Sequence, residues 1–221
     1  MPLKFKIMRC FLVSIFFLFS AVAIAQYNNR DSNHIGISAG VSQLSLFSDQ
    51  FNATPGQGFI GGFSLRGNYY NNWQAVYGMH FSQSTFSLES ITNKEIDFTM
   101  EAVQIYFCFS YRVIENHLNL EIGPVLQVNG KLKINKEDEL ALLKDSPLVT
   151  ASDLTDITKI NGNLYAGITA GIKHVRFHVS YQYGFNNIMN NLNKNNDLKT
   201  LNGEKFKGNI GLLSAMITVY L

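Results

Sequence analysis

Two His-x-Ser pairs come nearer to a catalytic arrangement than any other residues of this sequence. They are His80–Ser82 and His178–Ser180, and in each the histidine precedes the serine by two residues. Residues two apart on a β-strand share one face, so each histidine could activate its serine as a nucleophile for ester hydrolysis. The five histidines show no metal-ligand spacing beyond these pairs.

Charged side chains form a second candidate site, on the face of the segments that we expect to point inward. They are Arg66, Arg112, Glu121, Lys173 and Arg176. A charged group in a protein interior must be paired. We therefore predict a structural ion-pair cluster in which three arginines surround Glu121: Arg66, Arg112 and Arg176. On this hypothesis the cluster fills the interior, and removing Arg66 and Glu121 together should open a path for water.

The elements that would position these residues are eight segments in which apolar and polar residues alternate with a period of two, as in β-strands. The clearest covers residues 102–112, where Val103, Ile105 and Phe107 alternate with Gln104 and Tyr106. Proline cannot donate to a sheet ladder, so we expect a bulge at Pro124. The eight segments are 34–42, 58–69, 73–84, 102–112, 118–129, 164–172, 175–184 and 211–221.

Short and long connections alternate strictly between these segments. The short ones are 70–72, 114–117 and 173–174, and the long ones are 44–57, 88–97, 131–159 and 186–205. This alternation predicts an eight-stranded antiparallel up-and-down transmembrane β-barrel with short periplasmic turns and long extracellular loops. A soluble barrel of eight strands would need the opposite polarity, with apolar residues inside.

Aromatic residues and loop sequences refine this prediction. Tyr69, Trp73 and Tyr111 lie beside the short turns, where an interfacial girdle is expected. Residues 136–144 could form a short helix with an apolar side, but a solvated loop with one helical turn is the favoured interpretation. The asparagine-rich residues 186–196 should be mobile. We expect the opposite girdle to contain Phe59, Phe98, Tyr183, Phe185 and Phe206.

Residues 1–25 have the three parts of a secretory signal peptide: a basic start, an apolar run at 11–24, and small residues at Ala23 and Ala25. Cleavage after Ala25 would leave residues 26–221 as a barrel domain exported to the bacterial outer membrane. That part has 15 basic and 16 acidic residues, so it has no basic excess for a nucleic-acid partner. Cys108 is its single cysteine, which excludes an intramolecular disulfide.

Several short sequences carry a resemblance to a known family. They are Ala25–Gln26 at the signal junction, HIGISAG at 34–40, GFIGGF at 58–63 and LEIGP at 120–124. With these, the chain resembles the PorT-like outer-membrane β-barrel family of Gram-negative bacteria. The resemblance implies an outer-membrane barrel of about this size, and the family's namesake is implicated in secretion and assembly of exported proteins. One departure is Leu221 at the terminus, where such barrels usually end in an aromatic residue.

Three functions compete on this evidence. The first is a small non-enzymatic barrel that acts through its extracellular loops in assembly, interaction or secretion. We expect it to be a monomer that contacts outer-membrane lipid and other envelope or secretion proteins, without a cofactor, a metal or catalytic residues. The second is a narrow pore or transporter for small molecules. The third is a lipid-modifying hydrolase, because outer-membrane lipid A deacylases use a His-x-Ser pair. However, both pairs here occupy inward-facing positions of their strands (inward parity), away from lipid.

Overall fold

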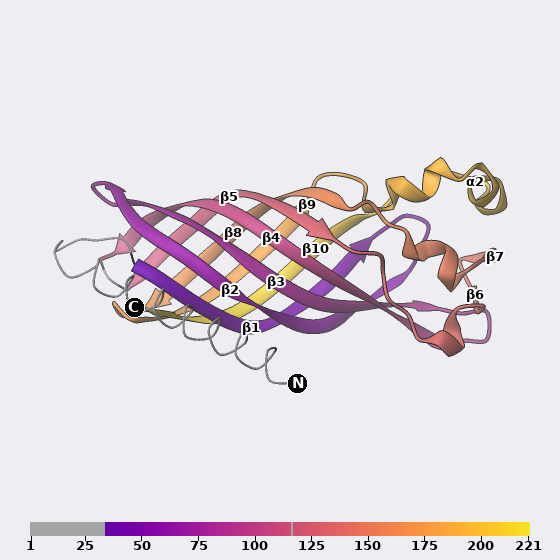
Figure 1. The fold of residues 1–221 in the computed structure, drawn as a ribbon, viewed down its shortest axis with the longest axis horizontal. Coiled ribbons are helices and arrows are strands. Elements are labelled where there is room, and N and C mark those ends of the chain that lie inside the picture. The colour runs from indigo at the N-terminus through magenta and orange to yellow at the C-terminus, as the bar shows by residue number, and fades with distance from the viewer. Residues whose placement is uncertain (1–33, 116) are drawn as a thin grey trace, which may run out of the picture.

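Eight long strands close into one antiparallel barrel in the computed structural model, which describes residues 34–115 and 117–221 (Figure 1). The ladder order is β1-β10-β9-β8-β5-β4-β3-β2, and β1 and β2 close the ring. The predicted eight-stranded up-and-down barrel is confirmed. Its strands are β1 (His34–Phe47), β2 (Ala53–Tyr70), β3 (Trp73–Glu89), β4 (Glu95–Ile114), β5 (Leu118–Asn129), β8 (Ile160–Gly171), β9 (Val175–Gly184) and β10 (Asn209–Tyr220).

The two faces of each strand follow the predicted parity. On β4, Val103, Ile105 and Phe107 are exposed on the outer surface, while Gln104 and Tyr106 are buried inside. The outward apolar residues of β4 continue from Val103 to Val113, a length of ten residue steps. At about 3.3 Å per residue and a tilt of about 40°, that run is about 25 Å tall, the height of the apolar band of outer-membrane barrels.

Phe107→Arg should therefore impair membrane insertion, because Phe107 faces lipid near the middle of the apolar band. A midplane arginine costs about 2–4 kcal/mol in such barrels. The measurement is the fraction of protein that resists detergent unfolding on an unheated gel. Glu95→Arg is the control, because Glu95 has the same outward parity on β4 but lies beyond the band. Equal folded fractions for the two variants would contradict the assignment of the lipid face.

The predicted bulge at Pro124 is wrong. The β4–β5 ladder skips Phe107 and Cys108, which lie opposite Pro124 and Gly123, but its register is the same on both sides of the gap. Pro124 removes one donor without adding a residue, and it remains paired with Leu164 on β8. Gly123 permits the close approach of β4, because a Cβ atom there would lie 1.9 Å from the Phe107 carbonyl oxygen.

The first two extracellular connections are shorter than predicted, because their flanking strands continue beyond the membrane. The β1–β2 and β3–β4 connections cover only 48–52 and 90–94, instead of 44–57 and 88–97. On this extension of β4 the polarity of the faces is reversed. Ile96, Phe98 and Met100 are buried inside, while Asp97 and Glu95 lie on the outer face. Water replaces lipid outside at this level, so the apolar face turns inward.

The other two extracellular connections are long and structured. The first holds η1 (Lys136–Asp138), β6 (Leu142–Leu143), β7 (Ser146–Thr150) and η2 (Ala151–Thr155). Of the two predictions for residues 136–144, a loop with one helical turn is confirmed, because only residues 136–138 are helical. The second holds η3 (Ile188–Lys194) and α2 (Asn196–Asn202). Among the residues that the structure describes, no helix is long and apolar enough to cross a membrane.

The asparagine-rich segment is fixed by its own side chains, contrary to the predicted mobility. The Asn187 side chain accepts hydrogen bonds from the backbone N–H groups of Met189 and Gly208, at 3.0 and 2.9 Å, and donates to the Phe206 carbonyl oxygen. Ile188, Met189 and Leu192 are buried. The asparagines thus satisfy backbone groups of a turn that covers the barrel mouth.

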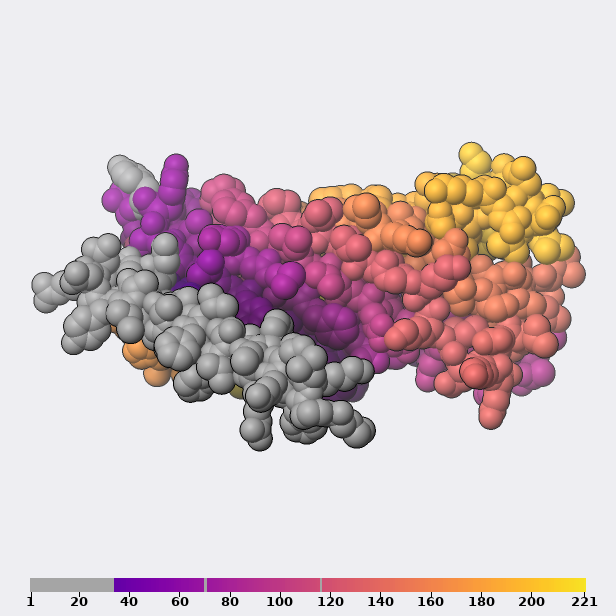
Figure 2. All heavy atoms as spheres, in the orientation of Figure 1, coloured from indigo at the N-terminus to yellow at the C-terminus, as the bar shows by residue number. Residues whose placement is uncertain are grey.

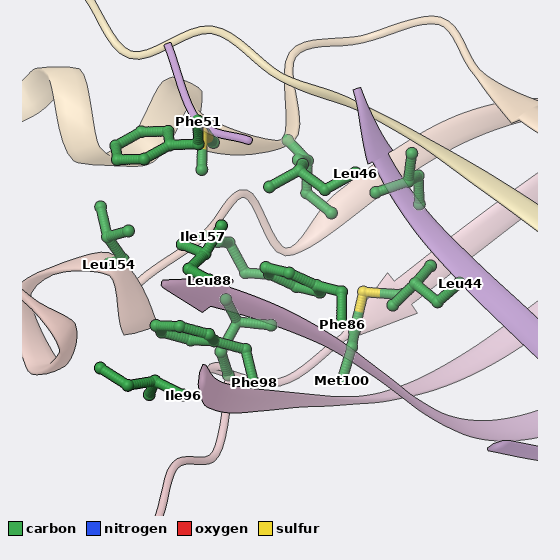
Figure 3. Packing of buried hydrophobic residues seen from close by; sticks show 14 of the residues in the cluster. Leu44, Leu46, Phe51, Phe86, Leu88, Ile96, Phe98, Met100, Leu154 and Ile157 are labelled. Carbon is green, nitrogen blue, oxygen red and sulfur yellow. The ribbon is translucent and has the colours of Figure 1, made fainter. Parts of the chain in front are cut away.

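These strand extensions and loops together form what we call the extracellular cap, residues 44–60, 83–101, 130–160 and 185–212. Its parts gather at the right-hand end of the molecule in the ribbon and space-filling views (Figures 1 and 2). Inside it lies an apolar core contributed by β1–β4, β10 and both long connections (Figure 3). Phe98 stacks on Phe86 and Phe206 on Phe51, with ring centroids 5.4 and 6.2 Å apart.

The predicted extracellular girdle needs a correction at two positions. Phe98 and Phe206 are completely buried in the cap core and do not face lipid. Phe59, Tyr183 and Phe185 are exposed on the outer surface, as expected.

Candidate functional site: the filled barrel interior

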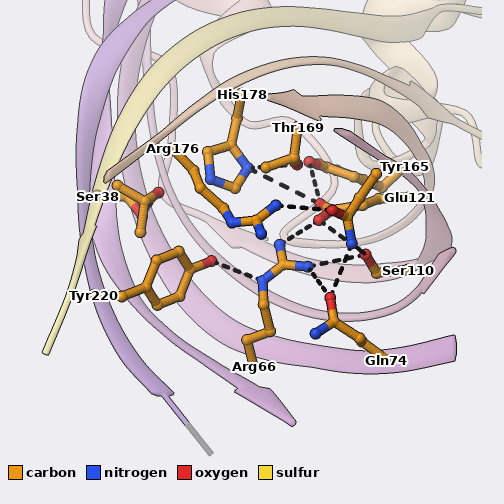
Figure 4. Close-up of polar contacts among 12 residues, drawn as sticks. Ser38, Arg66, Gln74, Ser110, Glu121, Tyr165, Thr169, Arg176, His178 and Tyr220 are labelled. Carbon is orange, nitrogen blue, oxygen red and sulfur yellow. Dashed lines mark hydrogen bonds and ion pairs between the residues drawn. The ribbon is translucent and has the colours of Figure 1, made fainter. Parts of the chain in front are cut away.

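A buried ion pair crosses the lumen near the end with the short turns, which is the periplasmic end of such barrels (Figure 4). Arg66 of β2 donates from Nη2 to Oε1 of Glu121 on β5, and the two side chains are each 3% exposed. β2 and β5 are separated by β3 and β4 in the ring, so the pair spans the bore and does not run along the wall.

The other donors of the Arg66 guanidinium are also satisfied. Nε donates to the Tyr220 hydroxyl at 3.1 Å, and Nη1 donates to Gln74 Oε1 and Ser110 Oγ at 3.0 and 2.9 Å. Tyr165 donates weakly to the second carboxylate oxygen of Glu121, at 3.4 Å. A buried charge pair is stable only when such additional hydrogen bonds replace lost water, and these contacts meet that requirement.

The remaining predicted members of the cluster have different environments. Arg176 donates to Asn119 Oδ1 at 2.8 Å, and Asn119 in turn donates to Gln74 and Ser110, so Arg176 joins the network through an amide. Arg112 lies apart: it donates to the backbone carbonyl of Asn71 in the β2–β3 turn.

Lys173 is exposed in the β8–β9 turn and does not point into the lumen. The structure therefore brings together Arg66, Glu121 and Arg176, but neither Arg112 nor Lys173. Arg112 keeps the inward alternation of β4 but lies close enough to the barrel end to bond to a turn carbonyl. Lys173 lies in a turn, where the alternation of faces no longer applies.

A layer of aromatic rings and histidines lies beyond the charged network. Tyr106 stacks on Tyr165 with ring centroids 6.1 Å apart, and its hydroxyl lies 3.3 Å from His80 Nε2. Cys108 and Val125 pack in the same cluster. Its large side chains come from β3, β4 and β8, and glycines leave room for them: a Cβ atom at Gly78 or Gly167 would lie 2.9 Å from the hydroxyl of Tyr106 or Tyr165, respectively. Large side chains opposite small ones fill a narrow bore without voids.

Both His-x-Ser pairs lie in the lumen, where no lipid reaches them. All four residues are buried, each at most 6% exposed. His178 Nδ1 lies 3.0 Å from the Thr169 hydroxyl, and Ser180 bonds to Ser214. Among the described residues, neither histidine forms a hydrogen bond with the serine of its pair. The arrangement that would activate a serine is not formed.

An amide layer closes the lumen beneath the cap. Gln182 donates to Gln104 at 2.9 Å, Gln104 donates to Gln127 at 3.3 Å, and Asn163 donates to the same Gln127 oxygen at 3.0 Å. Gln104 and Gln127 are essentially inaccessible to solvent. From the periplasmic end upward, the interior is therefore a charged network, an aromatic layer, an amide layer and the apolar cap core.

This sequence of layers determines what chemistry the interior can perform. Each layer is made of buried side chains that contact one another, so the layers stabilise the wall and block the bore. In the part of the chain that the structure describes, no group of three or more histidine, cysteine or acidic residues could hold a metal ion. The interior is thus a packed polar core, as expected for an eight-stranded barrel.

Sequence reasoning missed the amide layer and the role of Tyr220. The signal for the layer was present, because Gln104, Gln127 and Gln182 all have inward parity at similar distances from the strand ends. Glutamine and asparagine each offer both a donor and an acceptor, so neighbouring amides can bond in a chain, although the side-chain oxygens of Asn163 and Gln182 have no partner among the described residues. Tyr220 lies on an inward position of the last strand, but its contact with Arg66 follows from closure of β10 onto β1, which the sequence does not encode locally.

Comparison with known proteins agrees with this architecture. The family described as "Outer membrane protein beta-barrel domain" matches residues 24–190. The chain belongs to this family. It is an outer-membrane β-barrel protein. The predicted signal peptide at 1–25 lies outside the residues that the structure describes. No curated protein matches the sequence.

Two solved structures share the fold at low sequence identity. Neisserial surface protein A, from Neisseria, aligns with a TM-score of 0.50 and 12% identity over 86% of this chain and 99% of its own. Ail, the attachment invasion locus protein of Yersinia pestis, in complex with the heparin analogue sucrose octasulfate, aligns with a TM-score of 0.51 and 14% identity over 86% and 99%. At these identities the likeness concerns the fold alone.

Proposed function

We propose that the protein is a closed, non-enzymatic outer-membrane barrel that acts through its extracellular cap as a binding component for another envelope protein. The observation that carries this proposal is the filled lumen, which is blocked in four successive layers and continues into an ordered cap. A pore needs a continuous polar path, and an enzyme acting on lipid needs catalytic groups that lipid can reach. The interior offers neither, which leaves the cap as the functional surface.

Conductance separates a binding barrel from a pore. We expect purified protein in planar bilayers to give no discrete single-channel steps, with an open porin as the positive control. Arg66→Ala combined with Glu121→Ala should also remain closed. This replaces the sequence-based expectation that removing the ion pair opens the bore, because the amide layer and the cap core still block it. Discrete current steps from the unaltered protein would reject the proposal in favour of the pore.

The cap exposes several large apolar side chains, which are not expected on a surface that contacts only water. Leu140, just before β6, is 84% exposed, and Leu148, in β7, is 64% exposed. Ile91 and Leu201, which are also exposed, belong to segments bonded to the β6–β7 hairpin: the Ile91 N–H donates to the Leu142 carbonyl, and Ser146 donates to Asn202. Exposed apolar groups that gather in one place are typical of protein-binding sites.

The cap proposal predicts where a partner can be cross-linked. A photoreactive residue at position 148 should give a discrete adduct in intact cells, whereas one at position 114, at the opposite end of the barrel, should not. The PorT-like resemblance suggests a component of secretion or assembly as that partner. Adducts of the same size from both positions, or from neither, would contradict binding through the cap.

A polyanion such as the heparin analogue bound by Ail is a poorer fit for this cap. The cap contains ten lysines and thirteen acidic residues. Several of these lysines are paired with acids, as in Lys94 with Asp138 at 2.5 Å and Lys133 with Glu101 at 2.6 Å. The hydrogen bond to Asp138 raises the pKa of Lys94. A balanced, slightly acidic surface does not attract polyanions, which favours a protein partner.

A further inference from the structure

A hollow of about 450 Å³ opens on the lipid-facing side of the barrel, across β9, β10, β1 and β2. Its walls include Val41, Phe59, Val179 and Leu213, whose side chains point outward, and Ala215 lies among them. Ser42 and Ser214 bond to other serines inside the lumen, so only their backbone can border the outer surface. The floor is therefore backbone and one methyl group.

The sheet register explains why the surface is hollow here. Ala215 lies directly between Val41 on β1 and Val179 on β9 in a row of outward residues. The next outward residues of β1 and β2 in the periplasmic direction are Ala39 and Gly61, which pair with each other. Small residues flanked by Phe59 and Leu213 leave a depression that lipid, and not water, must fill in a membrane.

The upper rim of the hollow is polar and uncharged. Gln43 and Gln57 pair across β1 and β2, one outward step above Val41 and Phe59, and both are exposed. At the same boundary β3 and β4 carry Gln83 opposite Glu101. The apolar band thus ends at this level, and the hollow lies just inside the extracellular leaflet with two amide side chains above it.

We propose that this hollow is a binding site for an outer-leaflet glycolipid whose acyl chain lies against Ala215 and whose acyl linkage bonds to Gln43 and Gln57. Amide side chains both donate and accept, which suits the amide, ester and hydroxyl groups at the head of such acyl chains. A phosphate-directed site would instead use arginine or lysine. Apolar burial gives no net gain within a bilayer, so selectivity comes from close packing and the two amides. The inference does not depend on the function proposed for the cap.

The test uses full-length protein in nanodiscs of phosphatidylethanolamine with added hexa-acylated lipid A, followed by native mass spectrometry after release into mild detergent. We expect one retained lipid A on the unaltered protein. Ala215→Leu should reduce this adduct at least about fivefold because it fills the hollow. Ala166→Leu is the matched control, because Ala166 is an outward alanine on β8, away from the hollow, and it should bind normally.

The rim is tested separately, so that the result does not depend on one variant. Gln43→Leu combined with Gln57→Leu should also lose lipid A, whereas Gln83→Leu, an outward amide outside the hollow, should not. Equal adducts in all variants would show unspecific boundary lipid and overturn the proposal. Retention of phosphatidylethanolamine in place of lipid A would overturn the glycolipid assignment. If the unaltered protein instead gave the mass of a dimer, and Ala215→Leu gave only the monomer, the hollow would be a contact site for a second copy of the chain.

Discussion

Replacing Glu121 with alanine is expected to lower the free energy of unfolding by about 3–5 kcal/mol, the range found when one partner of a buried pair is removed. The variant leaves the Arg66 guanidinium buried in the bore with only neutral partners. Arg176, joined to the same network through Asn119, loses a nearby negative charge as well. The measurement is equilibrium urea unfolding of the protein in lipid vesicles.

Glu115→Ala is the matched control for this prediction. Glu115 is exposed in the β4–β5 turn and should change stability by less than about 0.5 kcal/mol. A double-mutant cycle with Arg66→Met tests the pairing itself, because the second substitution removes the stranded charge. The doubly substituted barrel should be more stable than Glu121→Ala alone. If the two effects simply add, Arg66 and Glu121 do not interact, and the ion-pair interpretation fails.

The alternation of inward and outward residues along each strand allowed the residues that meet in the lumen to be predicted from the sequence. On strands with one face in lipid, a one-residue slip would place every apolar residue inside, so the register is strongly determined. That argument placed Arg66, Glu121 and Arg176 inside, where they now lie together. It did not predict the partners of the other two: Arg112 bonds to a turn carbonyl at the end of β4, and Lys173 lies in a turn, where the alternation of faces ends.

The cap was harder to predict because the polarity pattern changes its meaning along a single strand. In β4, the residues that share the lumenal parity are polar or small at Gln104 and Ser110 but apolar at Ile96 and Phe98. Residues 95–101 alternate as regularly as the membrane part, so they did carry the signature of a strand. The segment would have been recognised as a strand, and not as a loop, only if its outer face had been expected to meet water, with polar residues outside and apolar residues inside.

Phe98→Ala is expected to lower the stability of the cap by about 3–5 kcal/mol, the usual cost of removing a buried phenylalanine ring. Phe98 is completely buried, stacks on Phe86, and lies where β4 meets the long connections in the cap core. The cavity would remain open, because backbone ladders hold both strands in register. We expect the cap to unfold locally, so that amide hydrogen exchange rises in β6, β7 and η2 while the barrel stays folded.

Phe107→Ala is the control, because it removes the same aromatic ring from the same strand without removing any packing contact of the cap core. Phe107 lies on the same strand but on the lipid face, where acyl chains refill the space, and its truncation should leave hydrogen exchange in the cap unchanged. Faster exchange throughout the barrel in Phe98→Ala would mean that cap and barrel unfold as one unit. No change in the cap would mean that its apolar core does not hold it in place, and the cap could then not serve as a preformed binding surface.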